Sequence, residues 1–191
     1  MEAFGKLFYG LHRPEARHAV LNGSSLVARL YRLSPWGYSC TGALTTLFNE
    51  RLATYDPVFP FAILGCFLMA QGYFSYMADV HAFGLPNSIW HRRDTIMATI
   101  LMIVVGPILG VRMMAGYCDM SSCPHLGYFW VAACMLALFC KIMSGYCSRH
   151  VKHSIEPFLF WHTGWHVLPW LSCGMVVDMA VRAVHVKQHS S

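Results

Sequence analysis

The fold is decided by residues 157–177, PFLFWHTGWHVLPWLSCGMVV, which are apolar apart from small polar residues and two histidines. A stretch of about 20 such residues can cross a bilayer as a single helix. His162 and His166 are four residues apart, so a helix places both imidazoles on one face, one turn from each other. Two histidines so placed can hold one metal ion, and ionisable groups inside a span usually mark a functional site. The alternative explanation is helix packing or hydrogen bonding without a metal.

The composition places this stretch in a membrane protein. Of 191 residues, 56% are hydrophobic and only 12% are charged, whereas about a quarter are charged in ordinary soluble domains. We therefore expect an all-α, multi-pass transmembrane helix bundle in an endomembrane or the plasma membrane, in contact with the lipid bilayer. The net charge of +5 is scattered, with no run of five or more basic residues, which argues against nucleic acid as a partner.

We expect five spans within a transmembrane domain, 34–178, that follows a basic segment, 1–33, and precedes a short tail, 179–191. The predicted spans are 34–49, 57–79, 95–116, 126–143 and 156–178. The first is marginal, because it is shorter than the 17 or so residues that a span needs and is rich in small polar residues. Ahead of it, residues 23–33 fit a short amphipathic helix on the membrane surface.

The distribution of basic residues predicts the orientation of the bundle. With five spans, the N-terminal segment and the loops 80–94 and 144–155 share one side, together with 10 of the Lys and Arg residues against 4 on the other. The positive-inside rule makes that side cytosolic. The orientation depends on 34–49, since the loop 80–94 changes sides if this stretch does not cross.

Alternation of helix direction brings several polar residues to one membrane face, whichever way the bundle is oriented. Asp79 ends one predicted span, Asp94 begins the next, and His162 and His166 lie in the first half of the last. Ser75 precedes Asp79 by one helical turn. These side chains could form a zinc site with a position open for water, whose proton a nearby carboxylate could accept. The alternative is that both aspartates simply mark span boundaries.

The same residues resemble a known superfamily of membrane hydrolases. Ser75 near the end of one span, Asp94 in RRDT and the histidine pair in H-T-G-W-H occur in the order found in the CREST-type superfamily. This superfamily includes alkaline ceramidases, adiponectin receptors, post-GPI-attachment remodelling proteins and myomaker. The resemblance covers roughly 50–100 and 157–170. It implies a seven-helix fold, a Zn²⁺ bound by three histidines, and hydrolysis of a lipid amide or ester by water held between zinc, Asp and Ser.

Two departures from that pattern leave alternatives open. The superfamily usually has histidine four residues after the serine, where this chain has Asp79, with His81 two residues further on. Either residue could be the third ligand. Between Asp94 and His162 there is room for one span where the superfamily would have three.

The preferred hypothesis is a zinc-dependent integral-membrane hydrolase acting on a ceramide-like, GPI or phospholipid substrate. In it, His162 and His166 bind zinc with Asp79 or His81, Asp94 acts on the water, and Ser75 hydrogen-bonds the water or the oxyanion. One alternative is a non-catalytic scaffold, fusion or trafficking factor of the same superfamily. Another is a haem-binding electron carrier with His162 or His166 as axial ligand.

Overall fold

The structure is a computed structural model that describes residues 14–85, 88–112, 125–150 and 154–189. All regular elements in these ranges are helical, which confirms the predicted all-α class. The α-helices and the two π-helical segments, η1 and η2, are α2 (Pro14–Asn22), α3 (Leu26–Leu33), α4 (Trp36–Leu47), α5 (Asn49–Tyr55), α6 (Phe61–Tyr76), η1 (Met77–His81), α7 (Ile89–Thr99), η2 (Ile100–Val105), α8 (Gly106–Arg112), α9 (His125–His150) and α10 (Glu156–His189).

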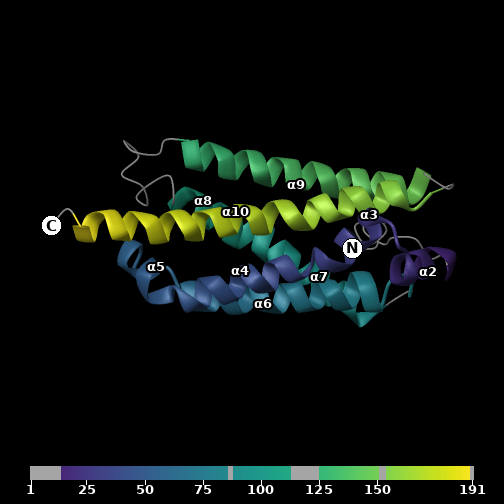
Figure 1. Cartoon of the computed structure of the whole chain (residues 1–191), viewed down its shortest axis with the longest axis horizontal. Helices are drawn as coiled ribbons and strands as arrows, with labels where there is room; N and C mark the ends of the chain where they lie inside the picture. Colours follow the sequence, from purple (N-terminus) through teal and green to yellow (C-terminus); the bar gives the residue numbers. More distant parts are fainter. Residues whose placement is uncertain (1–13, 86–87, 113–124, 151–153, 190–191) are drawn as a thin grey trace.

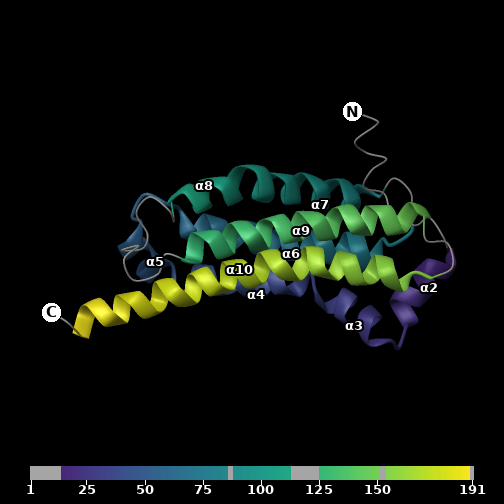
Figure 2. The same cartoon turned by 90° about the horizontal axis from the view of Figure 1, so that it is seen from above.

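The long elements form a bundle in which the chain reverses direction at each connection. In Figures 1 and 2, α4, α6, α7 to α8, α9 and α10 all run along the long axis of the molecule. The most extensive helix pairings are α4 with α6 and α9 with α10. The end of α6, the start of α7 and the start of α10 consequently lie at the same end of the bundle, as alternation predicted.

Within the described residues, three helical stretches are long and apolar enough to span a membrane: Phe61–His81, Ile89–Arg112 and Val131–His150. They correspond to the predicted spans 57–79, 95–116 and 126–143, with different bounds. The helix of the second begins at Ile89, so 89–94 are helical and not part of a loop, and 113–116 lie outside the described residues. The helix of the third continues to His150, so 144–150 are also helical where a loop was predicted. The last predicted span, 156–178, lies within the single helix α10.

The first predicted span, 34–49, is too short in the structure to cross a bilayer. Its helix, α4, has 12 residues, which at about 1.5 Å per residue is well below the 30 Å or so of a bilayer core.

Small residues hold α4 directly against α6. A Cβ added at Gly65 would lie 2.1 Å from Thr46 Oγ1 and 2.7 Å from the Gly42 carbonyl oxygen, so the two backbones are nearly in contact. Ser39 Oγ also donates to the Met69 carbonyl oxygen at 3.2 Å. Close approach through small residues is a common way to pair helices in membranes, and here it keeps a short, weakly apolar helix in the bundle.

Helix α3 covers the end of the bundle where the predicted site lies (Figure 1). It begins at the N-cap Ser25, whose side chain accepts a hydrogen bond from the Ala28 N–H. The helix is amphipathic, as its sequence predicted: Tyr31 is fully buried, whereas Leu26 and Leu33 are exposed. One face of α3 is therefore packed into the bundle end.

An ion pair closes the opposite end of the bundle. Asp56, just after α5, accepts hydrogen bonds from Nε and Nη2 of Arg112, the last residue of α8. Asp56 also accepts from the backbone N–H groups of Val58 and Phe59 at 3.0 and 3.1 Å. This group, called here the clamp, fixes the start of α6 to the end of α8.

Candidate metal centre

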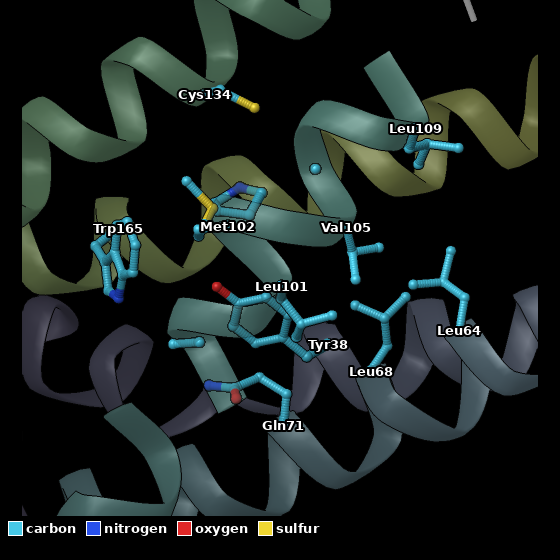
Figure 3. Close-up of a pocket in the computed structure, with 13 residues that line it drawn as sticks. Tyr38, Leu64, Leu68, Gln71, Leu101, Met102, Val105, Leu109, Cys134 and Trp165 are labelled. Atoms are coloured by element: carbon cyan, nitrogen blue, oxygen red, sulfur yellow. The ribbon is translucent and has the colours of Figure 1, made fainter. Parts of the chain in front are cut away.

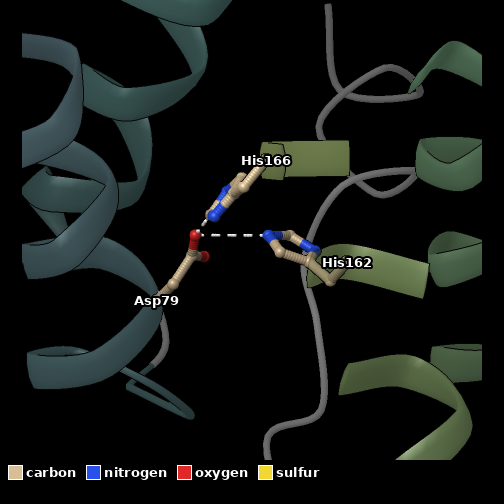
Figure 4. A group of neighbouring side chains, drawn as sticks. All are labelled: Asp79, His162 and His166. Carbon is tan, nitrogen blue, oxygen red and sulfur yellow. Dashed lines mark hydrogen bonds and ion pairs between the residues drawn. The ribbon is translucent and has the colours of Figure 1, made fainter. Parts of the chain in front are cut away.

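Asp79, His162 and His166 form a buried cluster at the end of the bundle covered by α3. The carboxylate oxygen Oδ2 of Asp79 lies 3.2 Å from His162 Nε2 and 3.1 Å from His166 Nε2. Figure 4 shows the three side chains meeting at one point from opposite elements. Their ligand atoms all lie within 4.8 Å of one another, and all three residues are buried. The sequence analysis predicted this convergence, and the structure places the three residues together.

Local helix geometry places each side chain of the cluster. His162 and His166 are one turn apart on α10, and their ring centroids are 4.8 Å apart. Asp79 lies on η1, the π-helical segment that continues α6. A π-turn contains one residue more than an α-turn, so it changes the helix face on which the following side chains emerge, and such segments are frequent at functional sites.

The hydrogen bonds of Ser34 determine where the proton of His166 lies. Ser34 Oγ is 2.9 Å from the Tyr31 carbonyl oxygen and 3.0 Å from His166 Nδ1. A carbonyl can only accept, so the single hydroxyl proton goes to Tyr31, and Ser34 Oγ accepts from Nδ1–H. In a neutral His166, Nε2 then carries a lone pair that faces the Asp79 carboxylate. Two lone pairs 3.1 Å apart repel each other, so either a proton on Nε2 or a metal ion must lie between them.

The surroundings of His162 are consistent with the same conclusion. Its Nε2 approaches the same Asp79 oxygen as His166 does, and its Nδ1 is buried without a hydrogen-bond partner. The imidazole lies against the Tyr31 ring, with centroids 5.5 Å apart. The hydrogen bonds of the protein therefore leave one imidazole nitrogen of the cluster unpaired.

The spacing of the three ligand atoms suits one metal ion. Ligand atoms each about 2.0–2.2 Å from a tetrahedral ion lie roughly 3.3–3.6 Å from each other. The two distances from Asp79 Oδ2 to the histidine nitrogens, 3.1 and 3.2 Å, are close to this range, and all three ligand atoms lie within 4.8 Å of one another. Two histidines and one carboxylate leave coordination positions open, as in catalytic rather than structural sites. The same donor set also suits iron(II), so the geometry defines a metal-binding group without naming the metal.

A second polar group adjoins the cluster and contains the other predicted site residues. The Ser75 hydroxyl, on α6 one turn before Asp79, donates to Oδ1 of Asp94 on α7. Gln71 Nε2 donates to Ser75 Oγ at 2.8 Å and to Asp94 Oδ1 at 2.7 Å. Ser75 and Gln71 are almost completely buried. The Asp94 carboxylate is therefore held by two side chains of α6.

His81, the other predicted candidate for the third ligand, lies elsewhere. Its side chain is exposed, and its carbonyl oxygen accepts a hydrogen bond from Arg17 Nη2. Of the two alternatives that the sequence left open, the structure brings Asp79 to the histidines and leaves His81 outside the cluster.

Three residues of the site were missed by sequence reasoning. Ser34 and Tyr31 are more than 125 positions from the histidines they contact, and no local pattern connects them. Gln71 could have been identified from the sequence, because it is a single amide residue in an apolar run, one helical turn before Ser75.

Comparison with known proteins does not extend these observations. No protein-family model matches the chain, and no curated protein or solved structure shows significant similarity to it. The interpretation of the site therefore depends on its geometry.

Proposed function

We propose that this chain is an integral-membrane, zinc-dependent hydrolase that cleaves an amide or ester bond of a membrane lipid. The observation that carries the proposal is the buried Asp79 carboxylate, whose Oδ2 is approached by Nε2 of both His162 and His166. The proton of His166 is assigned to Nδ1 by Ser34. A metal ion satisfies all three ligand atoms.

The exposed surface supports location in a bilayer. Large apolar side chains point outward along the candidate spans. Among them, Ile103, Val111, Met135 and Ile142 are each 59–69% exposed. Apolar patches this extensive on a soluble monomer would be unusual. Lipid chains are the environment that matches them.

The chemistry divides between the two polar groups. Asp79, His162 and His166 would hold the zinc ion, which when bound supplies Lewis-acid activation of water at neutral pH. With such an ion in place, Asp94 would accept a proton from a water molecule and return it to the amine or alcohol, as the water oxygen bonds to the acyl carbon and the acyl bond to the amine or alcohol breaks. Ser75 and Gln71 orient Asp94 through their hydrogen bonds. The roles of Asp94, His162 and His166 agree with those that the resemblance to the CREST-type superfamily implies, and membership in it is part of the proposal. Two roles differ from that pattern: Asp79 takes the place of the third histidine, and Ser75 donates its proton to Asp94 instead of to the water or the oxyanion.

The test is lipid hydrolysis by protein purified in detergent, with products identified by mass spectrometry. Ceramides, phospholipids and GPI lipids would be offered to the wild type, Asp94→Asn and the control Asp56→Asn. We expect Asp94→Asn to keep its metal and lose on the order of 10²–10⁴-fold in rate, as removal of a general base does. Asp56→Asn, at the far end, should retain the rate.

His162→Ala should lose both the metal and hydrolysis. Full activity of Asp94→Asn or of His162→Ala would contradict the proposal, as would the absence of hydrolysis by the metal-loaded wild type.

One observation favours a second candidate, a non-catalytic scaffold of the same superfamily. The cluster is buried beneath α3, with His166 only 1% exposed, and the Ser75 proton is already committed to Asp94. A metal ion that no lipid reaches fits such a buried site. Stoichiometric metal without turnover of any lipid would favour this candidate. The haem alternative is less consistent with the structure, because both histidines are on one helix and face the same carboxylate.

A further inference from the structure

An apolar cavity begins beside the polar groups and extends along the bundle. Its walls come from α4, α6, α7 with η2 and α8, α9 and α10 (Figure 3). Gln71 and Trp165 line one part of it, and Leu64 and Leu109 line another. Gln71 and Leu64 are seven residues apart on α6, about 10 Å along the helix axis. The cavity therefore connects the region of Asp94 with the apolar interior of the bundle.

The amide of Gln71 is fixed in one orientation. Its two neighbours both present acceptors, because the Asp94 carboxylate can only accept and the Ser75 hydroxyl proton is donated to Asp94. The NH₂ group of Gln71 must face them, as the bonds of 2.8 and 2.7 Å show. The carbonyl oxygen Oε1 consequently points away from both. It is buried and has no hydrogen-bond partner, and Gln71 is only 2% exposed.

A buried acceptor without a donor is costly and calls for a partner. An ordered water needs two to four polar neighbours, and the cavity wall around Gln71 consists mainly of apolar side chains such as Leu68, Leu101 and Met102. A ligand that combines an apolar chain with one hydrogen-bond donor fits both features. Oε1 and Nε2 of Gln71 belong to the same amide, and Nε2 contacts Asp94. A ligand group that donates to Oε1 would therefore lie next to Asp94.

We propose that Gln71 Oε1 accepts the N–H of an acyl amide whose chain occupies this cavity, so that the protein selects N-acyl lipids over matched esters. An ester places an oxygen lone pair where the amide has its proton, so the two acceptors would repel each other. The inference deepens the proposed function, on which it rests for the bond that is cleaved. The binding preference itself is measurable without turnover.

The test compares two lipids that share a dibromostearoyl chain, one an amide of an amino alcohol and the other the ester of the corresponding diol. Bromine quenches tryptophan fluorescence, and Trp165 lines the cavity. We expect the amide to bind wild-type protein on the order of tenfold more tightly than the ester, the effect of one buried hydrogen bond against an unpaired acceptor. Trp165→Phe should remove most of the quenching, which locates the ligand.

Gln71→Met keeps the side-chain length and removes the acceptor, so it should bind both lipids equally. The control Leu68→Met changes the same wall without changing polarity and should keep the preference. If the wild type binds both lipids equally, that measurement alone overturns the inference, and no variant is needed. Absence of quenching, or a preference retained in Gln71→Met, also overturns it. An amide preference without hydrolysis of either lipid would leave the inference standing and refute the proposed hydrolase.

Discussion

The two ends of this bundle each bury an aspartate, and their surroundings differ. At the clamp, Asp56 receives four donors, two from the Arg112 guanidinium and two from backbone N–H groups. At the candidate metal centre, Asp79 meets two histidine nitrogens at one oxygen, and its partner His162 has an unpaired Nδ1. One carboxylate is fully satisfied by the protein, and the other is not.

This difference in hydrogen bonding indicates that Asp56 supports the fold and that Asp79 serves binding or chemistry. Buried polar groups in folded proteins are nearly always paired, so the exceptions usually have a role beyond stability. Two of the five unpaired buried side-chain atoms in the described residues, His162 Nδ1 and Gln71 Oε1, belong to the two polar groups at the end covered by α3. We therefore expect changes at the clamp to affect folding, and changes at the metal centre to affect binding and chemistry.

The largest effect on folding should come from Asp56→Ala. Loss of this carboxylate removes the ion pair and leaves two backbone N–H groups without their acceptor, at a cost of about 1–3 kcal/mol in the free energy of unfolding. Denaturation in detergent measures it. The exposed Glu50 on α5 provides the control, because Glu50→Ala should change the free energy by less than about 0.5 kcal/mol. An equal effect of the two changes would contradict the role of the clamp.

The clamp also has a predictable pH dependence. The hydrogen bonds from Arg112, and secondarily those from Val58 and Phe59, lower the pKa of the Asp56 carboxyl from its ordinary value. Because the pKa of Asp56 is lower in the folded state, its carboxylate stabilises the fold fully at pH values above the unfolded pKa of about 3.9. This stabilisation is lost as the pH falls through the folded-state pKa. The difference in stability between wild type and Asp56→Ala should therefore shrink only in acid. A difference that shrinks near neutral pH would contradict this assignment.

The next effect concerns Ser34, which holds the His166 ring from outside the cluster. Ser34→Ala should weaken metal binding about 10–100-fold, the usual result of removing a hydrogen bond behind a ligating histidine. Competition with a metal chelator measures it. Ser144 is a matched control, because its buried hydroxyl bonds to the Lys141 carbonyl oxygen on its own helix. If Ser144→Ala lowered the metal affinity as much as Ser34→Ala does, the hydrogen bond from His166 to Ser34 would have no specific role in metal binding.

The smallest effect should come from Asp79→Asn in metal-free protein. An asparagine supplies N–H donors to the histidine lone pairs, so the free energy of unfolding should change by less than about 1 kcal/mol or increase. The same substitution at Asp56 should lower stability. A loss above about 2 kcal/mol for Asp79→Asn would show that Asp79 supports the fold without a metal, as Asp56 does.

The sequence predicted the helical class and the meeting of the site residues for a simple physical reason. Apolar length defines spans, and alternating spans return to the same face, so Asp79, Asp94 and the histidine pair had to converge. Contacts between distant helices could not be predicted in this way. Ser34 reaches His166 only because small residues pair α4 with α6 and bring α3 over the bundle end. The π-helical turn that carries Asp79 likewise has no marker in the sequence.

The most direct test of the central claim is the metal content of the wild-type protein, purified in detergent without chelators and analysed for both zinc and iron. The account predicts about one zinc per chain, lost in the His162→Ala/His166→Ala double variant and retained in Asp56→Asn. A folded wild type that contains no metal, and takes up none when zinc is added, would contradict it and leave the Asp–His–His cluster as a hydrogen-bonded part of the bundle.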